Sequence, residues 1–90
     1  MIFVAAGDSM EPTINDGDLV MVDQRDDWLR DGLFAFTLGD EARIKRLHRL
    51  IDGVEIRSDN DELYSPEFVR GAQADQLQII GRVVWAGRTY

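Results

Sequence analysis

The sequence contains no cysteine among its 90 residues. This absence excludes disulfide bonds, thiolate zinc sites and a cysteine nucleophile. Long apolar segments are also lacking, because the longest runs reach about six residues and a membrane-spanning helix needs about 20. The segment Met1–Ala6 has no basic start and is too short for a signal peptide. We therefore expect a soluble, cytoplasmic protein with no membrane partner.

Basic residues are few, with 10 Lys and Arg against 17 Asp and Glu, which gives a net charge of -7. A domain this acidic is poorly suited to bind a phosphate backbone by itself. The carboxylates are dispersed among turns, with no EF-hand pattern and no histidine partner, so we predict no metal site and no cofactor. The length leaves room for one domain, residues 1–90.

Turn residues recur along the chain and separate short segments that have strand character. Asp-Gly pairs occur at 16–17, 31–32 and 52–53, and Gly39-Asp40 marks a fourth turn. The pair at 52–53 suits a type I′ hairpin. The segments with strand character are Leu19–Val22, Leu33–Leu38, the mixed run Ala42–Ile51, Val54–Arg57 and Ile79–Trp85. Residues 9–14 and 65–74 have room for a helical turn or two. The pattern predicts a mostly β, antiparallel domain with one or two short helical turns.

Lysine is nearly absent: the sequence contains nine arginines but only one lysine, Lys45. Arginine stays protonated in proteins, whereas a buried lysine loses its proton more readily and can then act as a base. The plainer interpretation is a codon bias toward arginine that leaves Lys45 on a solvated strand. Composition alone favours that interpretation.

Ser9 is a candidate nucleophile in the segment Gly7-Asp8-Ser9-Met10-Glu11-Pro12. Gly7 permits a sharp turn, and the backbone N–H groups that follow could form an oxyanion hole. The alternative is that Ser9 or Asp8 only caps a short turn. For an isolated Ser-Met-x-Pro sequence, this structural role is the more common one.

His48 is the only histidine, and it leaves open a Ser-His pair. If residues 43–50 form a strand, Lys45 and His48 point to opposite faces, so only one of them can face a given site. We expect His48 to be a half-exposed strand residue. The basic cluster around it lacks interleaved aromatic residues, so a salt-bridged strand face is favoured over nucleic-acid binding. The cluster consists of Arg43, Lys45, Arg46, His48 and Arg49.

Several motifs occur together in a specific order. Gly7-Asp8-Ser9-Met10-Glu11-Pro12-Thr13-Ile14 is followed by Asp16-Gly17-Asp18-Leu19-Val20 and then by Ile44-Lys45-Arg46-Leu47. Ser58-Asp59-Asn60, Tyr64 and Ile80-Gly81-Arg82-Val83 come later. Each motif alone is weak, but their order and spacing, from about Gly7 to Trp85, resemble the C-terminal domain family of LexA and phage repressors.

This resemblance implies a LexA/signal peptidase-like fold of coiled antiparallel β-sheets and a self-cleaving serine peptidase. Ser9 corresponds to the family nucleophile and Lys45, 36 positions later (45 − 9), to the general base. Gly7, Asp8 and Met10 form the turn around the nucleophile, and the Ser9 N–H would be an oxyanion donor. The chemistry requires a neutral amine, and burial can lower the pKa of a lysine by several units.

The resemblance also implies a regulatory context, that of a transcriptional repressor of the SOS-response type. DNA would be contacted only through an N-terminal helix-turn-helix domain that this sequence does not contain. A recombinase filament is a possible co-activator. The family dimerises through this domain, and we expect a homodimer through the apolar segment Ile79–Trp85.

Self-cleaving members of the family cut an Ala-Gly-like bond upstream of the serine. Ala6-Gly7 is such a dipeptide, but two residues span only about 7 Å, too little to fold back onto Ser9. Ala86-Gly87 is more simply interpreted as a strand end. We therefore expect no substrate bond within this sequence. Either the sequence is a fragment of a longer repressor, or it is a short relative that cleaves in trans or does not cleave at all.

Two other functions are compatible with the same motifs. A non-catalytic interaction module, similar to the processed form of a UmuD-like mutagenesis protein, would bind a polymerase or another partner. Signal peptidase shares the Ser-Met-x-Pro and Lys-Arg motifs, but it needs a membrane anchor and an apolar docking surface. The acidic sequence offers neither, so signal peptidase is the least favoured function.

Overall fold

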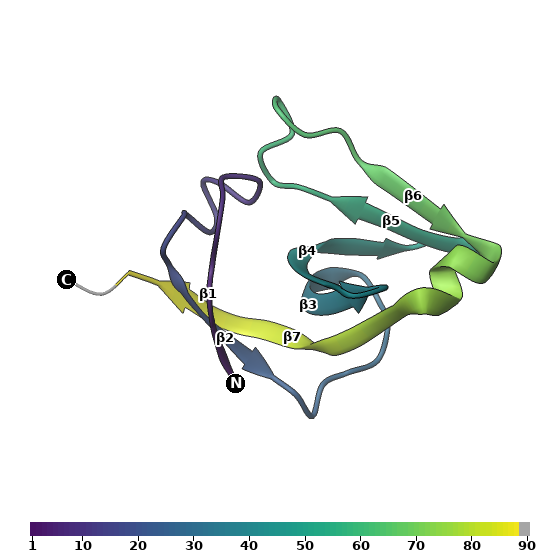
Figure 1. Ribbon diagram of the computed structural model, residues 1–90, viewed down its shortest axis with the longest axis horizontal. Helices are drawn as coiled ribbons and strands as arrows, with labels where there is room; N and C mark the ends of the chain where they lie inside the picture. The colour runs from purple at the N-terminus through teal and green to yellow at the C-terminus, as the bar shows by residue number, and fades with distance from the viewer. Residues whose placement is uncertain (89–90) are drawn as a thin grey trace.

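The computed structural model describes residues 1–88, which form one antiparallel sheet of seven strands (Figure 1). The strand order across the sheet is β1-β2-β7-β3-β4-β5-β6. The elements are β1 (Ile2–Val4), β2 (Leu19–Asp23), β3 (Gly32–Leu38), β4 (Glu41–Arg49), β5 (Gly53–Arg57), β6 (Glu67–Arg70), the 3₁₀ helix η1 (Gly71–Gln76) and β7 (Leu77–Gly87). The predicted mostly β fold is therefore confirmed.

Every segment predicted to be a strand overlaps a strand, although the predicted run 42–51 extends past the end of β4 at Arg49. The segment 65–74, which has room for a helical turn or two, is helical only in part. Its first half forms β6, and a 3₁₀ helix begins only at Gly71. The reason is packing, because Val69 of β6 is 2% exposed and joins the core, whereas η1 buries no residue. Among residues 1–88, η1 is the one helical element, in agreement with the one or two short helical turns that were predicted.

The turn between β4 and β5 also differs from its prediction. A type I′ turn needs a positive φ at both central residues. Among the described residues no non-glycine has a positive φ, and Gly53 itself is not left-handed. Gly53 is required for another reason: a Cβ there would lie 2.0 Å from the carbonyl oxygen of Val69 on β6. The glycine thus permits close strand pairing rather than the turn.

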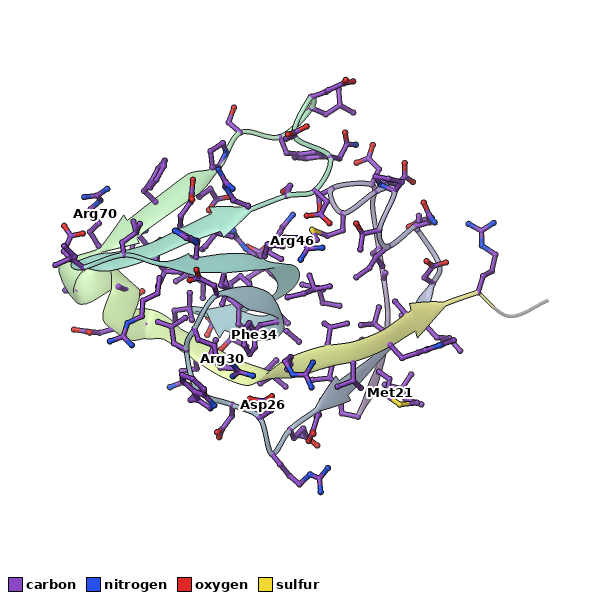
Figure 2. All side chains as sticks on the ribbon, turned by 180° about the vertical axis from the view of Figure 1, so that it is seen from behind. Met21, Asp26, Arg30, Phe34, Arg46 and Arg70 are labelled. Carbon is purple, nitrogen blue, oxygen red and sulfur yellow. The ribbon has the colours of Figure 1, made fainter. Side chains whose placement is uncertain are left out.

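Two hydrophobic cores lie on opposite sides of β3. The first contains the buried residues Phe34, Phe36, Leu47, Val54, Ile56 and Val69. The second contains Met10, Ile14, Val20, Val22 and Ala35. Successive side chains of a strand point to opposite faces, so Ala35 enters the second core between two phenylalanines of the first. Figure 2 shows Met21 and Arg70 at opposite ends of the sheet, with Phe34 between them.

β7 connects the two halves of the sheet, as Figure 1 shows for the long yellow strand. Its first half pairs with β3, and its second half pairs with β2. Register shifts in both ladders bend the strand where it passes from one partner to the other. Gly81 lies at this crossing, where a Cβ would approach the carbonyl oxygen of Asp23 to 2.4 Å. This curvature agrees with the coiled sheet that the family resemblance implied.

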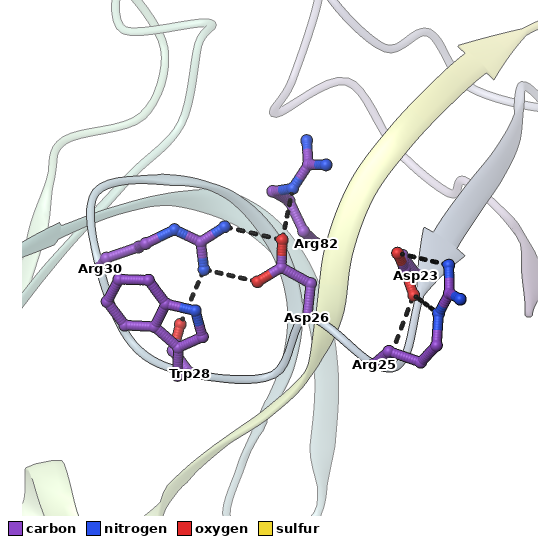
Figure 3. Close-up of polar contacts among 6 residues, drawn as sticks. All are labelled: Asp23, Arg25, Asp26, Trp28, Arg30 and Arg82. Carbon is purple, nitrogen blue, oxygen red and sulfur yellow. Dashed lines mark hydrogen bonds and ion pairs between the residues drawn. The ribbon is translucent and has the colours of Figure 1, made fainter.

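The loop between β2 and β3 is held against β7 by a charged cluster (Figure 3). Arg30 donates two hydrogen bonds to Asp26, at 2.6 and 2.7 Å, and Arg82 of β7 donates a third at 2.7 Å. These bonds lower the pKa of Asp26 to about 2. The Arg30 guanidinium also stacks over Trp28, 4.3 Å from the ring centroid.

Within residues 1–88, no helix has the length and apolar character needed to cross a membrane.

Candidate active site

Ser9 lies on a turn that leaves β1 and is anchored from both sides. Gly7 bends the chain with φ 88°, and its N–H donates to Asp16 Oδ1 at 2.8 Å. After Ser9, the side chain of Met10 is 5% exposed and that of Ile14 is 2% exposed, because both belong to the second core. The turn is therefore part of the folded core on one side and presents Ser9 on the other.

Lys45 reaches this turn from the middle of β4, where it pairs with Phe34 of β3. Its Nζ lies 2.5 Å from Ser9 Oγ and 3.0 Å from Ser58 Oγ, and it donates a hydrogen bond to each hydroxyl. The fold thus brings together the two residues that the sequence separates by 36 positions. Ser58, which sequence reasoning did not select as a site residue, is the third member of the cluster.

The environment of Lys45 favours its neutral form. Burial, and then the positive charge of Arg43, lowers the pKa of Lys45 below its ordinary value of 10.5. Glu67 and Glu41 act in the opposite direction and are themselves bound to Arg43, at 2.9 and 3.3 Å. A less basic lysine retains a larger neutral fraction near neutral pH, which is the state that can accept a proton.

The loop that follows β5 is fastened to the Ser9 turn. Asn60 donates its backbone N–H to the Ser9 carbonyl oxygen and its side-chain amide to that of Asp8, both at 3.0 Å. Tyr64 donates its hydroxyl to Asp8 Oδ1 at 2.5 Å, and its ring centroid lies 5.6 Å from Lys45 Nζ. Sequence reasoning included Asn60 and Tyr64 in the motif pattern without a role. Their role here is to hold the turn.

A cavity of about 590 Å³ opens beside Ser9 and Lys45. One wall is formed by residues 3–10, which run from β1 through the Ser9 turn, and the opposite wall by residues 41–45 of β4. The pairing of β4 with β5 begins only at Arg46, so residues 42–45 have no strand neighbour on that edge in the described chain. β1 pairs only with β2. Residues of two strands that each have an unpaired edge therefore line the cavity.

A family model described as Peptidase S24-like matches residues 1–84. The chain belongs to the Peptidase S24-like family. Similar proteins include a transcriptional regulator of the HTH type from Haemophilus influenzae, with 39% identity over 98% of this chain and 37% of the relative. Repressor protein CI of Enterobacteria phage phi80 is 42% identical over 94% of this chain and 35% of its own length. The LexA repressor of Clostridium tetani is 35% identical over 93% of this chain and 40% of its own length.

This S24-like chain thus spans between 35 and 40% of the length of these relatives. The resemblance to LexA and phage repressors is confirmed, and the chain is an S24-like domain of the repressor type.

His48 is not brought to the S24-like site. It lies on the opposite face of β4, where its Nδ1 is 2.9 Å from Asp31 Oδ2, and it is exposed as predicted. Its neighbour Arg46 pairs with Asp59 at 2.7 Å, which agrees with the predicted salt-bridged strand face. In the described part of the chain, no three His, Asp or Glu side chains gather in a group that could hold a metal ion.

Proposed function

We propose that this S24-like domain is the peptidase and dimerisation domain of a LexA-like or phage-type transcriptional repressor. Ser9 is the nucleophile and Lys45 the general base, and the substrate is a peptide bond in the repressor's own upstream linker. The observation that carries the proposal is the 2.5 Å contact between Lys45 Nζ and Ser9 Oγ at the edge of the cavity. Nucleophile and base within hydrogen-bond reach are the signature of an activated serine.

The proposed reaction proceeds by acyl transfer. Neutral Lys45 takes the proton of Ser9 as Oγ attacks the carbonyl carbon, and the carbonyl oxygen becomes an oxyanion that accepts from the Ser9 N–H. The C–N bond then breaks, and the Lys45 ammonium returns the proton to the leaving amine. Water hydrolyses the resulting ester with Lys45 again acting as base, so that a carboxylic acid leaves and the Ser9 hydroxyl is restored.

The cavity suits an extended peptide as the substrate. The free edges of β1 and of residues 42–45 offer backbone donors and acceptors on both sides. Apolar residues that line the cavity, among them Ala5, Ala35 and Ile44, would accept small side chains next to the bond that is cut. Ala86 and Gly87 are not available as this substrate, because both pair with β2.

Cleavage of the linker would detach the DNA-binding part of the repressor and reduce its affinity for paired half-sites. The printed names of the relatives, which are repressors and transcriptional regulators, support this regulatory context. In this proposal the domain itself does not bind DNA, and a recombinase filament is the candidate co-activator.

We propose that the domain also forms a homodimer through β7. Trp85 is half exposed, and the β-sheet register places it beside Met21, which lies beside Ile2, so that three exposed apolar side chains form a row. Sedimentation is expected to detect a dimer at micromolar concentration. A monomer at that concentration would contradict the dimer.

The experiment that tests the peptidase measures the intact mass of the native protein in its source cell before and after DNA damage. The expected result is a heavier species that converts to a fragment containing Ser9, and no conversion in a Ser9→Ala strain. A single unchanged mass in both strains would overturn self-cleavage. A non-catalytic, UmuD-like interaction module would then be the better account.

A further inference from the structure

Ser58 contacts the amine of Lys45, the proposed base. It is the first residue after β5, and the last β5 residue, Arg57, pairs with Arg46 of β4. Lys45 is the next residue along β4, so the ladder between the two strands brings Ser58 to Lys45. The partly buried Ser58 Oγ accepts a hydrogen bond from Lys45 Nζ at 3.0 Å.

A lysine base needs such a contact because its amine is otherwise free to rotate. A neutral amine has one lone pair and two N–H donors on a flexible four-carbon side chain. The lone pair removes the Ser9 proton only when it points at Ser9 Oγ. An acceptor in a fixed position that takes one N–H restricts the rotation of the amine and directs the lone pair to the other hydroxyl.

The two hydroxyls around Lys45 also differ in what else they face. Ser9 lines the large cavity, and Ser58 lines a separate, smaller cavity of about 300 Å³. Tyr64 lines both cavities. Ser58 is not among the residues that line the large cavity, whereas Ser9 and Lys45 are. The polar wall of the smaller cavity, which includes Asp61, allows the Ser58 O–H to point away from the amine.

We propose that Ser58 is a positioning residue that holds the Lys45 amine with its lone pair directed at Ser9 Oγ. The inference rests on the proposed Ser9 and Lys45 chemistry and adds a residue to it. Ser58 acts through Lys45 and touches neither the nucleophile nor the substrate. Its loss should therefore slow the chemical step and leave binding in the large cavity unchanged.

The test is the rate at which a fluorophosphonate modifies Ser9, measured by intact mass on the full chain. Ser9 Oγ bonds to phosphorus, the P–F bond breaks and fluoride leaves, while the serine proton passes to Lys45. A positioned base contributes about 10²- to 10⁴-fold, so Ser58→Ala should lower the saturating rate about tenfold with the half-saturating concentration unchanged. Ser58→Thr keeps a hydroxyl and should retain most of the rate.

Two controls make the outcome decisive. Ser65→Ala removes an exposed serine from the same loop and should react as the wild type does. Ser9→Ala should not react. A Ser58→Ala protein that reacts at the wild-type rate, or a Ser58→Thr protein that loses as much as Ser58→Ala, would overturn the role of Ser58 alone. If the wild type is not modified at Ser9, both the inference and the proposed function fail.

Discussion

Both faces of β4 carry basic residues, but the residues on the two faces differ in burial and in their hydrogen-bond partners. On one face, Lys45 is partly buried and hydrogen-bonds two serine hydroxyls. On the other face, His48 is exposed and lies against a carboxylate of Asp31. Arg46 on that same face is held by Asp59. The strand thus separates Lys45, which contacts two neutral hydroxyls, from His48 and Arg46, which lie against carboxylates.

The comparison shows that residue type alone does not identify the base. A histidine has the ordinary pKa closer to neutrality, so the sequence left a Ser-His pair open beside the favoured pair of Ser9 and Lys45. The structure separates the two candidates, because Lys45 Nζ contacts Ser9 Oγ, whereas His48 lies on the opposite face of β4 against Asp31. Burial and the nearby Arg43 then move the pKa of Lys45 in the direction that the chemistry requires.

The largest expected effect comes from removing the amine of the partly buried Lys45. Lys45→Met keeps the length and the apolar part of the side chain but cannot accept a proton. We expect the fluorophosphonate reaction of Ser9 to slow by about 10²- to 10⁴-fold, the contribution of a general base. Lys45→Arg should lose as much, because arginine does not deprotonate in proteins. A Lys45→Arg chain that still reacts would contradict the role of Lys45.

The second effect is on stability and concerns the support beneath Ser9. Met10→Ala leaves a cavity in the second core, where Met10 is 5% exposed, and should lower the free energy of unfolding by about 2–5 kcal/mol. Met21→Ala is the matched control, because Met21 is exposed on β2 and its loss should cost much less. Urea denaturation of both variants measures the difference. Equal losses would mean that the turn is not anchored by the core.

The third effect is a shift of the pH dependence. Arg43 lowers the pKa of Lys45, so Arg43→Gln should raise that pKa and move the alkaline rise of the Ser9 reaction to higher pH. At a fixed pH below the midpoint, the reaction should slow severalfold, because less lysine is neutral. Glu41→Gln removes a charge that raises the pKa and should move the profile to lower pH. Shifts in the same direction for both variants would contradict the electrostatic account.

The smallest effect is expected on the exposed face. His48→Ala removes a histidine whose partner is Asp31 and leaves the Lys45 side of the strand untouched. The rate of Ser9 modification and the shape of its pH profile should both stay within error of the wild type. A loss of activity in His48→Ala, without a loss in the Lys45 variants, would indicate that His48 and not Lys45 is the base.

The sequence predicted strands correctly where an Asp-Gly turn precedes a short apolar segment. β2, β3 and β5 follow such pairs, so their approximate positions were visible before the structure. β6 was missed because it has only four residues and its one buried side chain, Val69, is defined by packing on β5 rather than by local pattern. Gly53 was predicted to be a turn residue because its close contact with β6 also depends on packing and leaves no local pattern.

The candidate site was predictable in part. Ser9 and Lys45 came from the resemblance to a family, since each alone had a more common structural interpretation. Ser58 and Arg43 could not be selected, because their effect on Lys45 depends on how β4 pairs with β5 and how β6 supplies Glu67 to Arg43. Such contacts arise from strand register, which a single sequence does not specify.

The central claim is tested most directly by the pH dependence of Ser9 modification in the wild-type chain. The account predicts a rate that rises with pH and levels off below 10.5, the ordinary pKa of lysine, since burial and Arg43 lower the pKa of Lys45. A profile that stays flat from about pH 6 to pH 10 would contradict Lys45 as the base, as would a rise centred near the histidine value of about 6.5 that disappears in His48→Ala.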